Sequence, residues 1–346
     1  MLETAARQMH NLLVEHRHIL SRYFFGVAVV VALTLLAYLA THAPVLSRFH
    51  PMILALVFGM ALKNFFQLPT HAKLGISFSQ RRALRIGVSL LGIQISFSQI
   101  AEVGITGLAI LFTALTTTFI FTRLMGRAIG VDDRLCELIA SGTAVCGASA
   151  IVATNTVTLA PEEDVAYAVA SVTLFGSLSM VFYPLLLPLL PLDAHEYGLW
   201  VGASIHEVGQ VVAAAFQGGA EAGAFGTTSK LVRVIMLAPL VTAIGWWASH
   251  SRQTTNTSRD HVAVVPWFVL GFLGFVALNS IVEVDATVRG WFAQVTVFLL
   301  TMGLAAIGLE TDVSKLRLRG LKPFFLGLCA WIFISTSTLA LVIFLY

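Results

Sequence analysis

Long apolar runs recur along the whole chain, and they restrict the fold more than any other feature of the sequence. Of the 346 residues, 57% are hydrophobic and only 11% are charged, whereas an ordinary soluble domain is about 25% charged. The sequence therefore predicts an all-α polytopic membrane protein. The apolar segments fall at 24–41, 51–66, 84–100, 105–124, 134–158, 165–190, 196–216, 229–248, 264–281, 291–309 and 322–345.

We expect a single transmembrane domain over residues 23–346, preceded by a cytoplasmic segment, 1–22. That segment is polar and lacks the apolar core of a cleavable signal peptide. It is either an interfacial amphipathic helix or a solvated tail. The three cysteines lie in apolar segments, which argues against a disulfide framework. The net charge of +3 is small and says nothing useful about nucleic acid. We expect no nucleic-acid partner, and the sequence suggests neither a metal site nor a cofactor.

The distribution of lysine and arginine predicts how the chain is oriented. These residues gather before the first span, in the second and fourth connections, at 249–262 and before the last span. Connections rich in positive charge stay in the cytoplasm. We therefore expect the N-terminus to be cytoplasmic and the C-terminus external. This requires an odd number of crossings: eleven if every segment spans, or nine if 134–158 and 196–216 both re-enter the side they came from.

The sequence also repeats itself in permuted order. Residues 85–104 match 301–320 without a gap, at an offset of 216 (303 − 87), and 51–64 match 266–279. The two copies, about 51–190 and 196–345, would have opposite orientations in the membrane. Inverted repeats with discontinuous helices that meet near the bilayer midplane are typical of secondary transporters.

Two segments, 134–158 and 196–216, are rich in small residues and are interrupted by polar ones. They match each other at an offset of 60 (202 − 142), which aligns Cys146 with His206. We predict discontinuous or re-entrant helices, with one break at Gly147 and the other near Gly209. Each break would begin a half-helix whose free N–H groups favour an anion. The alternative is that the small residues only let helices pack closely.

Ionisable side chains within these segments are the strongest functional candidates, because charge at membrane depth is costly. His206 and Glu207 could carry a coupling proton, or could form a structural ion pair. Arg233 could bind an oxyanion or pair with Glu207, while Lys230 could instead reach out to water. The candidate substrate-binding residues are Cys146, Gly147, Ala148, Ser149, His206, Glu207, Gly209, Gln210, Lys230 and Arg233.

Four stretches resemble a known family. The runs GTAVCGASAIVAT (142–154), SIHEVGQVVAA (204–214), SKLVRVIMLAP (229–239) and LLGIQISFSQI (90–100) are similar to those of the YeiH-type bacterial inner-membrane proteins, a family named for sulfate export. The resemblance extends over about 25–340. It implies kinship with the bile-acid and arsenite class of transporters, whose discontinuous helices cross the membrane; this would favour crossing over re-entry.

We therefore expect a secondary transporter of a small anion, such as sulfate or an organosulfonate, with H⁺ or Na⁺ coupling and alternating access. One alternative is a cation/proton exchanger that uses Glu207; another is a passive channel. A third is an intramembrane thiol enzyme built on Cys146 and His206, although nothing in the sequence activates that thiol. A homodimer is also compatible with the sequence, since glycine pairs suit a dimer face as well as internal packing.

Overall fold

The structure is a computed structural model of the chain. It describes residues 23–43, 46–47, 49–66, 69–251, 267–282, 284–312 and 320–346. The predicted N-terminal segment 1–22 lies outside the described residues, as do 252–266 and 313–319, which hold several of the basic residues used to orient the chain. All regular secondary structure among the described residues is helical, which confirms the all-α prediction.

One compact unit is formed by the described residues between 23 and 87 together with 297–310. Its helices pack closely where glycines face each other. A methyl group on Gly59 would lie 3.1 Å from the Cα atom of Gly308, and one on Gly26 would lie 2.8 Å from that of Gly75. Small residues allow this approach between apolar helices. The unit contains the helix Tyr23–Ala40, α2 (Pro51–Phe65), α3 (Lys73–Phe78), a π-helical turn (Ser79–Ala83), the start of α4 (Leu84–Leu91) and the end of α15 (Ala286–Glu310).

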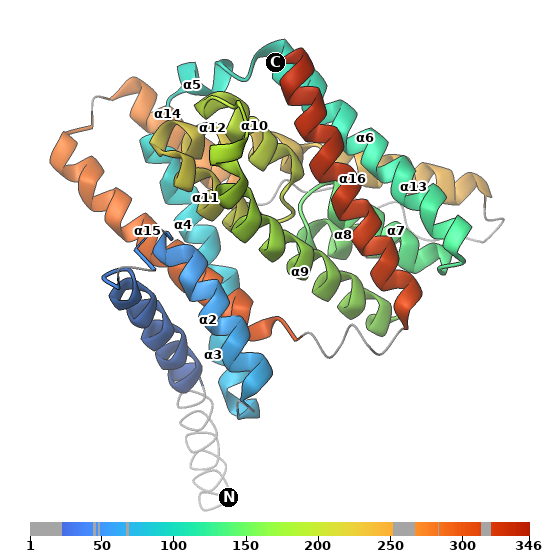
Figure 1. Cartoon of the computed structure of the whole chain (residues 1–346), viewed down its shortest axis with the longest axis horizontal. Helices are drawn as coiled ribbons and strands as arrows, with labels where there is room; N and C mark the ends of the chain where they lie inside the picture. The colour runs from blue at the N-terminus through green and yellow to red at the C-terminus, as the bar shows by residue number, and fades with distance from the viewer. Residues whose placement is uncertain are drawn as a thin grey trace, which may run out of the picture. The chain divides into compact units, whose positions relative to one another are not determined.

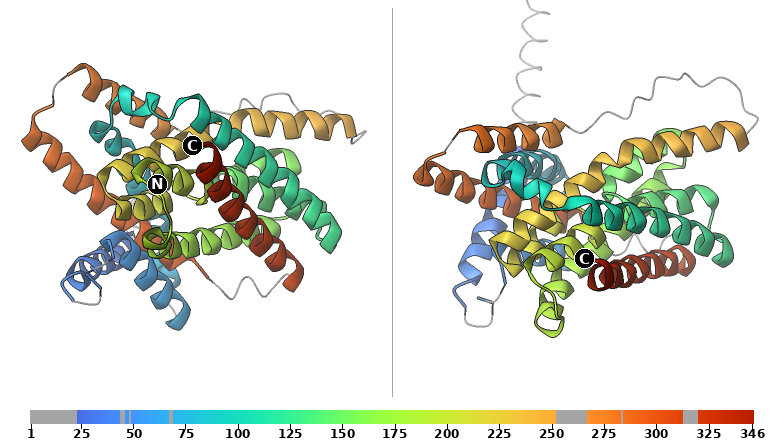
Figure 2. Two further views of the ribbon diagram at one scale, coloured as in Figure 1. Left: turned by 45° about the horizontal axis from the view of Figure 1, so that its top comes forward. Right: turned by 90° about the horizontal axis from the view of Figure 1, so that it is seen from above.

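The second unit, residues 88–296 and 311–346, holds all the predicted site residues. Within it α6 and α16 run side by side (Figures 1 and 2), with the rings of Phe121 and Phe333 stacked 4.1 Å apart. Its helices are α5 (Phe97–Ala101), α6 (Gly104–Ile129), α7 (Asp133–Ala144), α8 (Ala148–Thr158), α9 (Glu162–Leu186), α10 (Ala194–Ser204), α11 (Val208–Ala215), α12 (Ala220–Ile235), α13 (Leu237–Ser251), α14 (Trp267–Ile281), the start of α15, and α16 (Leu321–Leu345).

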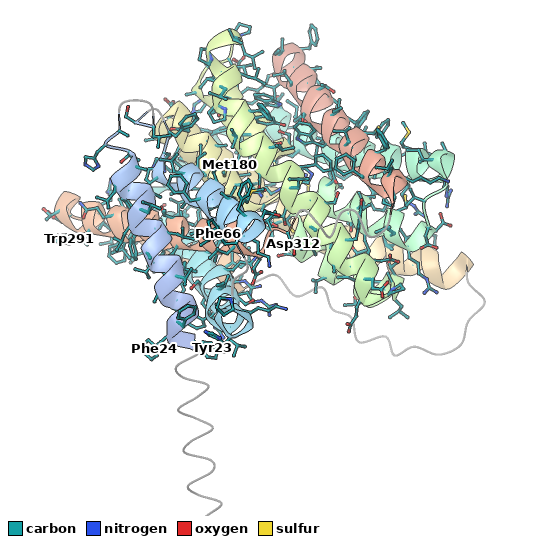
Figure 3. The ribbon with its side chains drawn as sticks, turned by 60° about the horizontal axis from the view of Figure 1, so that its bottom comes forward. Tyr23, Phe24, Phe66, Met180, Trp291 and Asp312 are labelled. Atoms are coloured by element: carbon teal, nitrogen blue, oxygen red, sulfur yellow. The ribbon has the colours of Figure 1, made fainter. Side chains whose placement is uncertain are left out.

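Six helices among the described residues are long and apolar enough to cross a membrane, and α2 and α14 are shorter apolar helices. Large apolar side chains point outward from several of them. Phe24 is 70% exposed and Trp291 is 67% exposed, and Figure 3 shows both projecting away from their helices. Large apolar side chains on long apolar helices are favoured where those helices face lipid. The chain is therefore a polytopic membrane protein, as predicted.

Helices α7 and α8 form a hairpin rather than one continuous rod. Two contacts join the start of α7 to the end of α8. The Thr158 hydroxyl donates to Glu137 Oε2 over 2.9 Å, and Arg134 Nη1 donates to the carbonyl of Leu159 over 3.1 Å. At the tip, Gly147 takes a φ of 65°, a left-handed value that suits glycine. The hairpin therefore enters and leaves at the same level.

Helices α10 and α11 form a second hairpin. The hydroxyl of Tyr197, in the first turn of α10, donates to the carbonyl of Ala214 near the end of α11 over 3.0 Å. A methyl group on Gly218 would meet the Tyr197 ring at 2.6 Å. Asp193 and Glu196 form a capping box that starts α10. This hairpin also returns to the level at which it began.

The two hairpins open at opposite ends of α9. This helix follows α8 and precedes α10, and its 25 residues span about 37 Å, enough to cross a bilayer. The ends of the hairpin helices follow the predicted offset of 60, because α7 and α10 end at residues 144 and 204, and α8 and α11 begin at 148 and 208. Both internal repeats, the shorter and the longer, stay predictions.

Candidate functional site

The tips of the two hairpins touch each other. A methyl group built on Gly147, at the tip between α7 and α8, would lie 2.7 Å from Cγ of Glu207 and 3.5 Å from the carbonyl of His206. The only side chain that fits at position 147 is therefore hydrogen. The two interrupted segments were predicted to meet, and the contact between Gly147 and Glu207 lies at the centre of that meeting.

Arg233 binds the ends of both entering helices. Its Nη1 atom donates to the carbonyls of Gly202 and Ala203 on α10, and its Nη2 atom donates to those of Thr143 and Ala144 on α7. The residue is fully buried. The last carbonyls of a helix lack internal partners and carry partial negative charge, so a guanidinium satisfies and stabilises them. One side chain therefore holds two helix ends together.

Lys230, one turn earlier on α12, extends the same arrangement to the turns themselves. Its Nζ donates to the carbonyl of Val145 over 2.6 Å and to that of Ile205 over 2.7 Å. These two residues occupy equivalent positions in the two hairpins, sixty apart (205 − 145). Lys230 is fully buried, so it does not reach water. The helix α12 begins at Ala220 and not at the predicted residue 229, so Lys230 lies in the middle of a helix and not at its end. The first turns of α12 have small, weakly apolar side chains, which hid them from the hydropathy pattern, but many of these side chains are buried in the protein.

Glu207 caps the returning helix α11. It forms a reciprocal capping box with Gln210, in which the Glu207 amide donates to Gln210 Oε1 over 3.2 Å. The hydroxyl of Thr173 on α9 donates to Glu207 Oε1, also over 3.2 Å. Because the same carboxylate lies against Gly147, where α8 begins, it sits beside the N-termini of both returning helices. It occupies the place where the sequence predicted a bound anion.

Gln210 ties the second tip to the middle of α9. Its Nε2 atom donates to the Thr173 carbonyl over 3.1 Å and to the Ser177 hydroxyl over 3.2 Å. Thr173 is eleven residues from the start of α9 (173 − 162), which places the tips about 17 Å from that end. The site therefore lies halfway along a helix that is long enough to cross the membrane.

Three buried polar atoms near the tips have no hydrogen-bond partner. They are Nδ1 of His206, Nε of Arg233 and Oγ of Ser229. All three residues are at most 1% exposed. Buried polar atoms normally have partners, so these atoms are the available donors or acceptors for a small ligand or water. His206 does not pair with Glu207 through Nδ1, so the predicted ion pair lacks that contact.

The predicted site residues fall into distinct places. Cys146 and Gly147 form the first tip, and Ala148 begins α8 and is only partly buried, while Ser149 is exposed and does not face the site. Gly209 is not the break, because α11 already begins at Val208 with Glu207 as its cap. The break falls over residues 205–207, since a capping side chain replaces the glycine that we expected there.

Thr173 and Ser177 were missed by the sequence analysis. They hold the second tip from α9, and a signal for them exists. The two residues are four apart in an otherwise apolar run, so they share one face of a helix. In a membrane helix, a pair of hydroxyl groups on one face indicates a polar contact with a neighbouring segment.

Comparison with known proteins places these residues in a family. Residues 25–327 match the family described as Conserved hypothetical protein 698. The chain is 33% identical over 319 residues to the UPF0324 membrane protein NMA0465 of Neisseria meningitidis, covering 90% of this chain and 94% of the relative. It is 36% identical over 296 residues to the UPF0324 membrane protein PA5383 of Pseudomonas aeruginosa, covering 81% and 82%. It is 32% identical over 347 residues to the UPF0324 inner membrane protein YeiH of Escherichia coli, covering 97% and 99%.

Proposed function

The chain belongs to the Conserved hypothetical protein 698 family of membrane proteins, and from this we propose that it is a secondary active transporter of a small anion. The family resemblance noted in the sequence favours an oxyanion such as sulfate or an organosulfonate. The similarity to an inner membrane protein of Escherichia coli supports the inner membrane as its location.

The buried charge at the hairpin tips carries the proposal. Lys230 and Arg233 supply two cationic groups, and Glu207 supplies one carboxylate. The partial charges of the helix ends cancel, because two C-termini and two N-termini meet at the same place. A surplus of positive charge in a low-dielectric interior must be balanced, and a small anion would balance it. The unpaired Nε of Arg233 and Nδ1 of His206 would be its hydrogen-bond partners.

The burial of the tips supports alternating access. His206, Gln210, Lys230 and Arg233 are at most 1% exposed, so a ligand can reach them only if packed elements move. Hairpins that open at opposite ends of α9 would give the site one route from each side of the membrane. We infer that the protein alternates between an inward-open and an outward-open state, and that this change carries the anion across the membrane.

The test is binding to the purified protein, followed by flux. Sulfate, sulfite, thiosulfate, taurine, bicarbonate, phosphate and small carboxylates would be screened by thermal shift, and binders tested for uptake into proteoliposomes. The expected result is that one anion raises the melting temperature and accumulates against its gradient. Flux without accumulation would indicate a channel instead. Loss of function in Cys146→Ser would point to a thiol enzyme; a transporter should tolerate that change.

A second candidate is a cation/proton exchanger, which the position of Glu207 favours. Its carboxylate already fills the place beside both helix N-termini, and it is 8% exposed, more than His206 or Gln210. A carboxylate that alternates between a proton and a metal cation needs no anionic substrate. In that case, no anion in the panel would alter the melting temperature, whereas Na⁺ or pH would, and Glu207→Gln would abolish that response.

A further inference from the structure

The carboxylate of Glu207 lies where an anionic substrate would have to bind. Its side chain packs against Gly147 at the start of α8 and caps the start of α11. These are the two helix N-termini that favour an anion. In a low-dielectric interior, two negative charges a few ångströms apart repel strongly. An ionised Glu207 and a bound anion therefore exclude each other.

Resting on the proposed function, we propose that Glu207 takes up a proton when an anion binds at the hairpin tips, so that each bound anion brings one proton onto the protein. The proton moves from water to the Glu207 carboxylate, and no covalent bond to the anion forms. This assigns the coupling ion as H⁺ rather than Na⁺, and it assigns the proton to one side chain.

The charge count agrees with this assignment. With Glu207 ionised, the two cations and one carboxylate leave one positive charge at the tips. With Glu207 protonated, Lys230 and Arg233 leave two, which a dianion such as sulfate would neutralise. A dianion that arrived without a proton would instead leave the buried site with a net negative charge, which is costly.

The other groups around Glu207 are poorer proton acceptors. Lys230 and Arg233, from α12, donate to carbonyls, and such contacts favour the protonated form of both groups. His206 follows Ile205, whose carbonyl binds Lys230, so a proton on its ring would add a third positive charge to the cluster. Among the described residues, the Cys146 thiol at the other tip and the Thr173 hydroxyl on α9 lie near the carboxylate. Tyr183, also on α9, lies near Arg233, whereas the Tyr197 hydroxyl binds the far end of α11.

Hydroxyl and amide contacts would hold Glu207 in either protonation state. A protonated carboxyl group keeps one oxygen as an acceptor for the capping amide of Gln210 and gains an O–H donor. The Thr173 hydroxyl can reverse its role, since it both donates and accepts. The site can therefore change charge without a rearrangement of the backbone at the second tip.

Proton uptake on anion binding tests the proposal. Sulfate, or whichever anion of the panel binds best, would be titrated into detergent-solubilised protein in weak buffer with a pH indicator. Calorimetry in two buffers of different ionisation heat would give a second measure. We expect about one proton per anion, and an affinity that weakens about tenfold per pH unit at alkaline pH. Replacing Na⁺ by choline should change neither value.

Three variants complete the design. Glu207→Gln should bind the anion without proton uptake and without pH dependence, whereas Glu207→Asp should restore both. The control Glu221→Gln removes an exposed carboxylate whose side chain is 67% accessible, and it should behave like the wild type. If Glu207→Gln does not fold, the Glu207→Asp variant must still take up a proton, with its pH dependence displaced from that of the wild type.

The outcomes separate this proposal from the function on which it rests. Anion binding by the wild type with no proton uptake, or continued uptake by Glu207→Gln, would overturn the proton assignment and leave an anion transporter. A dependence on Na⁺ would do the same. If no anion binds to the wild type at any pH, the proposed function fails as well.

Discussion

Gly147 and Glu207 face each other across the tips of two hairpins that enter from opposite ends of α9. A methyl group at position 147 would lie 2.7 Å from Glu207 Cγ, and the glycine has a φ of 65°. Backbone shape and side-chain contact therefore both require glycine at the point where the two halves of the site meet.

Gly147→Ala should consequently abolish anion binding and lower the melting temperature. The left-handed backbone alone costs about 1–3 kcal/mol, and the methyl group would also push Glu207 away from α8. The control is Gly104→Ala, because Gly104 has a similar φ of 59° but no atom within 4 Å of a new methyl group. Both should lose stability, but only Gly147→Ala should lose binding. Equal effects would mean that the contact with Glu207 has no role.

Arg233→Met should destabilise the protein even when no anion is present. The guanidinium donates to four carbonyls at the ends of α7 and α10, and loss of such a buried network costs about 3–5 kcal/mol. Arg233→Lys should recover little, because one ammonium cannot replace a planar fork. The exposed Arg289→Met, which removes a single long bond to the Val284 carbonyl, serves as the control.

The measurement for Arg233 is the melting temperature in anion-free buffer. A structural role predicts a large drop there, whereas a side chain that only bound substrate would leave the melting temperature unchanged and reduce the shift caused by the anion. The sequence predicted Arg233 as a substrate ligand or a partner of Glu207, and its free Nε can still bind an anion. An unchanged melting temperature would show that its contacts with the helix ends add no stability.

Gly176→Ala should disturb the second tip from the α9 side. A methyl group there would collide with Gln210 Oε1, which accepts from the Glu207 amide. Within a helix, alanine is otherwise favoured over glycine by about 0.5–1 kcal/mol. A loss of stability would therefore report the collision. The helical control Gly274→Ala meets no atom within 4 Å and should be neutral or slightly stabilising in the same melting assay.

The sequence predicted the fold class well because membrane helices leave a direct signal in apolar length. It also predicted that 134–158 and 196–216 are interrupted, since small residues and Gly147 mark a break. It could not predict the role of Lys230 and Arg233. Their partners are backbone carbonyls of residues 25 to 90 positions away. Every residue has a backbone carbonyl, so residue types do not show which carbonyls a buried side chain will contact.

The position of the second break shows another limit. The glycine at position 209 suggested that the helix breaks there, yet Glu207 caps α11 two residues earlier. Whether a side chain caps a helix depends on the N–H groups it can reach, and this follows from the fold of the tip rather than from local propensity. Thr173 and Ser177 were overlooked for a similar reason, since helix spacing shows that they share a face but not what that face meets.

The hairpins predict which residues can be labelled from each side of the membrane. In a background without native cysteines, Asp133→Cys and Glu162→Cys would lie at the mouth of the α7–α8 hairpin, and Pro191→Cys and Ala220→Cys at that of the α10–α11 hairpin. All four positions are exposed.

Each hairpin brings its own two ends together, and α9 separates the mouths of the two hairpins. The first pair of cysteines should therefore react with an impermeant maleimide from one side of the membrane only, and the second pair from the other side. If α7 and α8 instead crossed as one broken helix, as the family resemblance implied, residues 133 and 162 would label from opposite sides. The positive charge of the connections predicts a cytoplasmic position for the first mouth, so we expect inside-out vesicles to label Asp133→Cys and Glu162→Cys, and intact cells to label the other two.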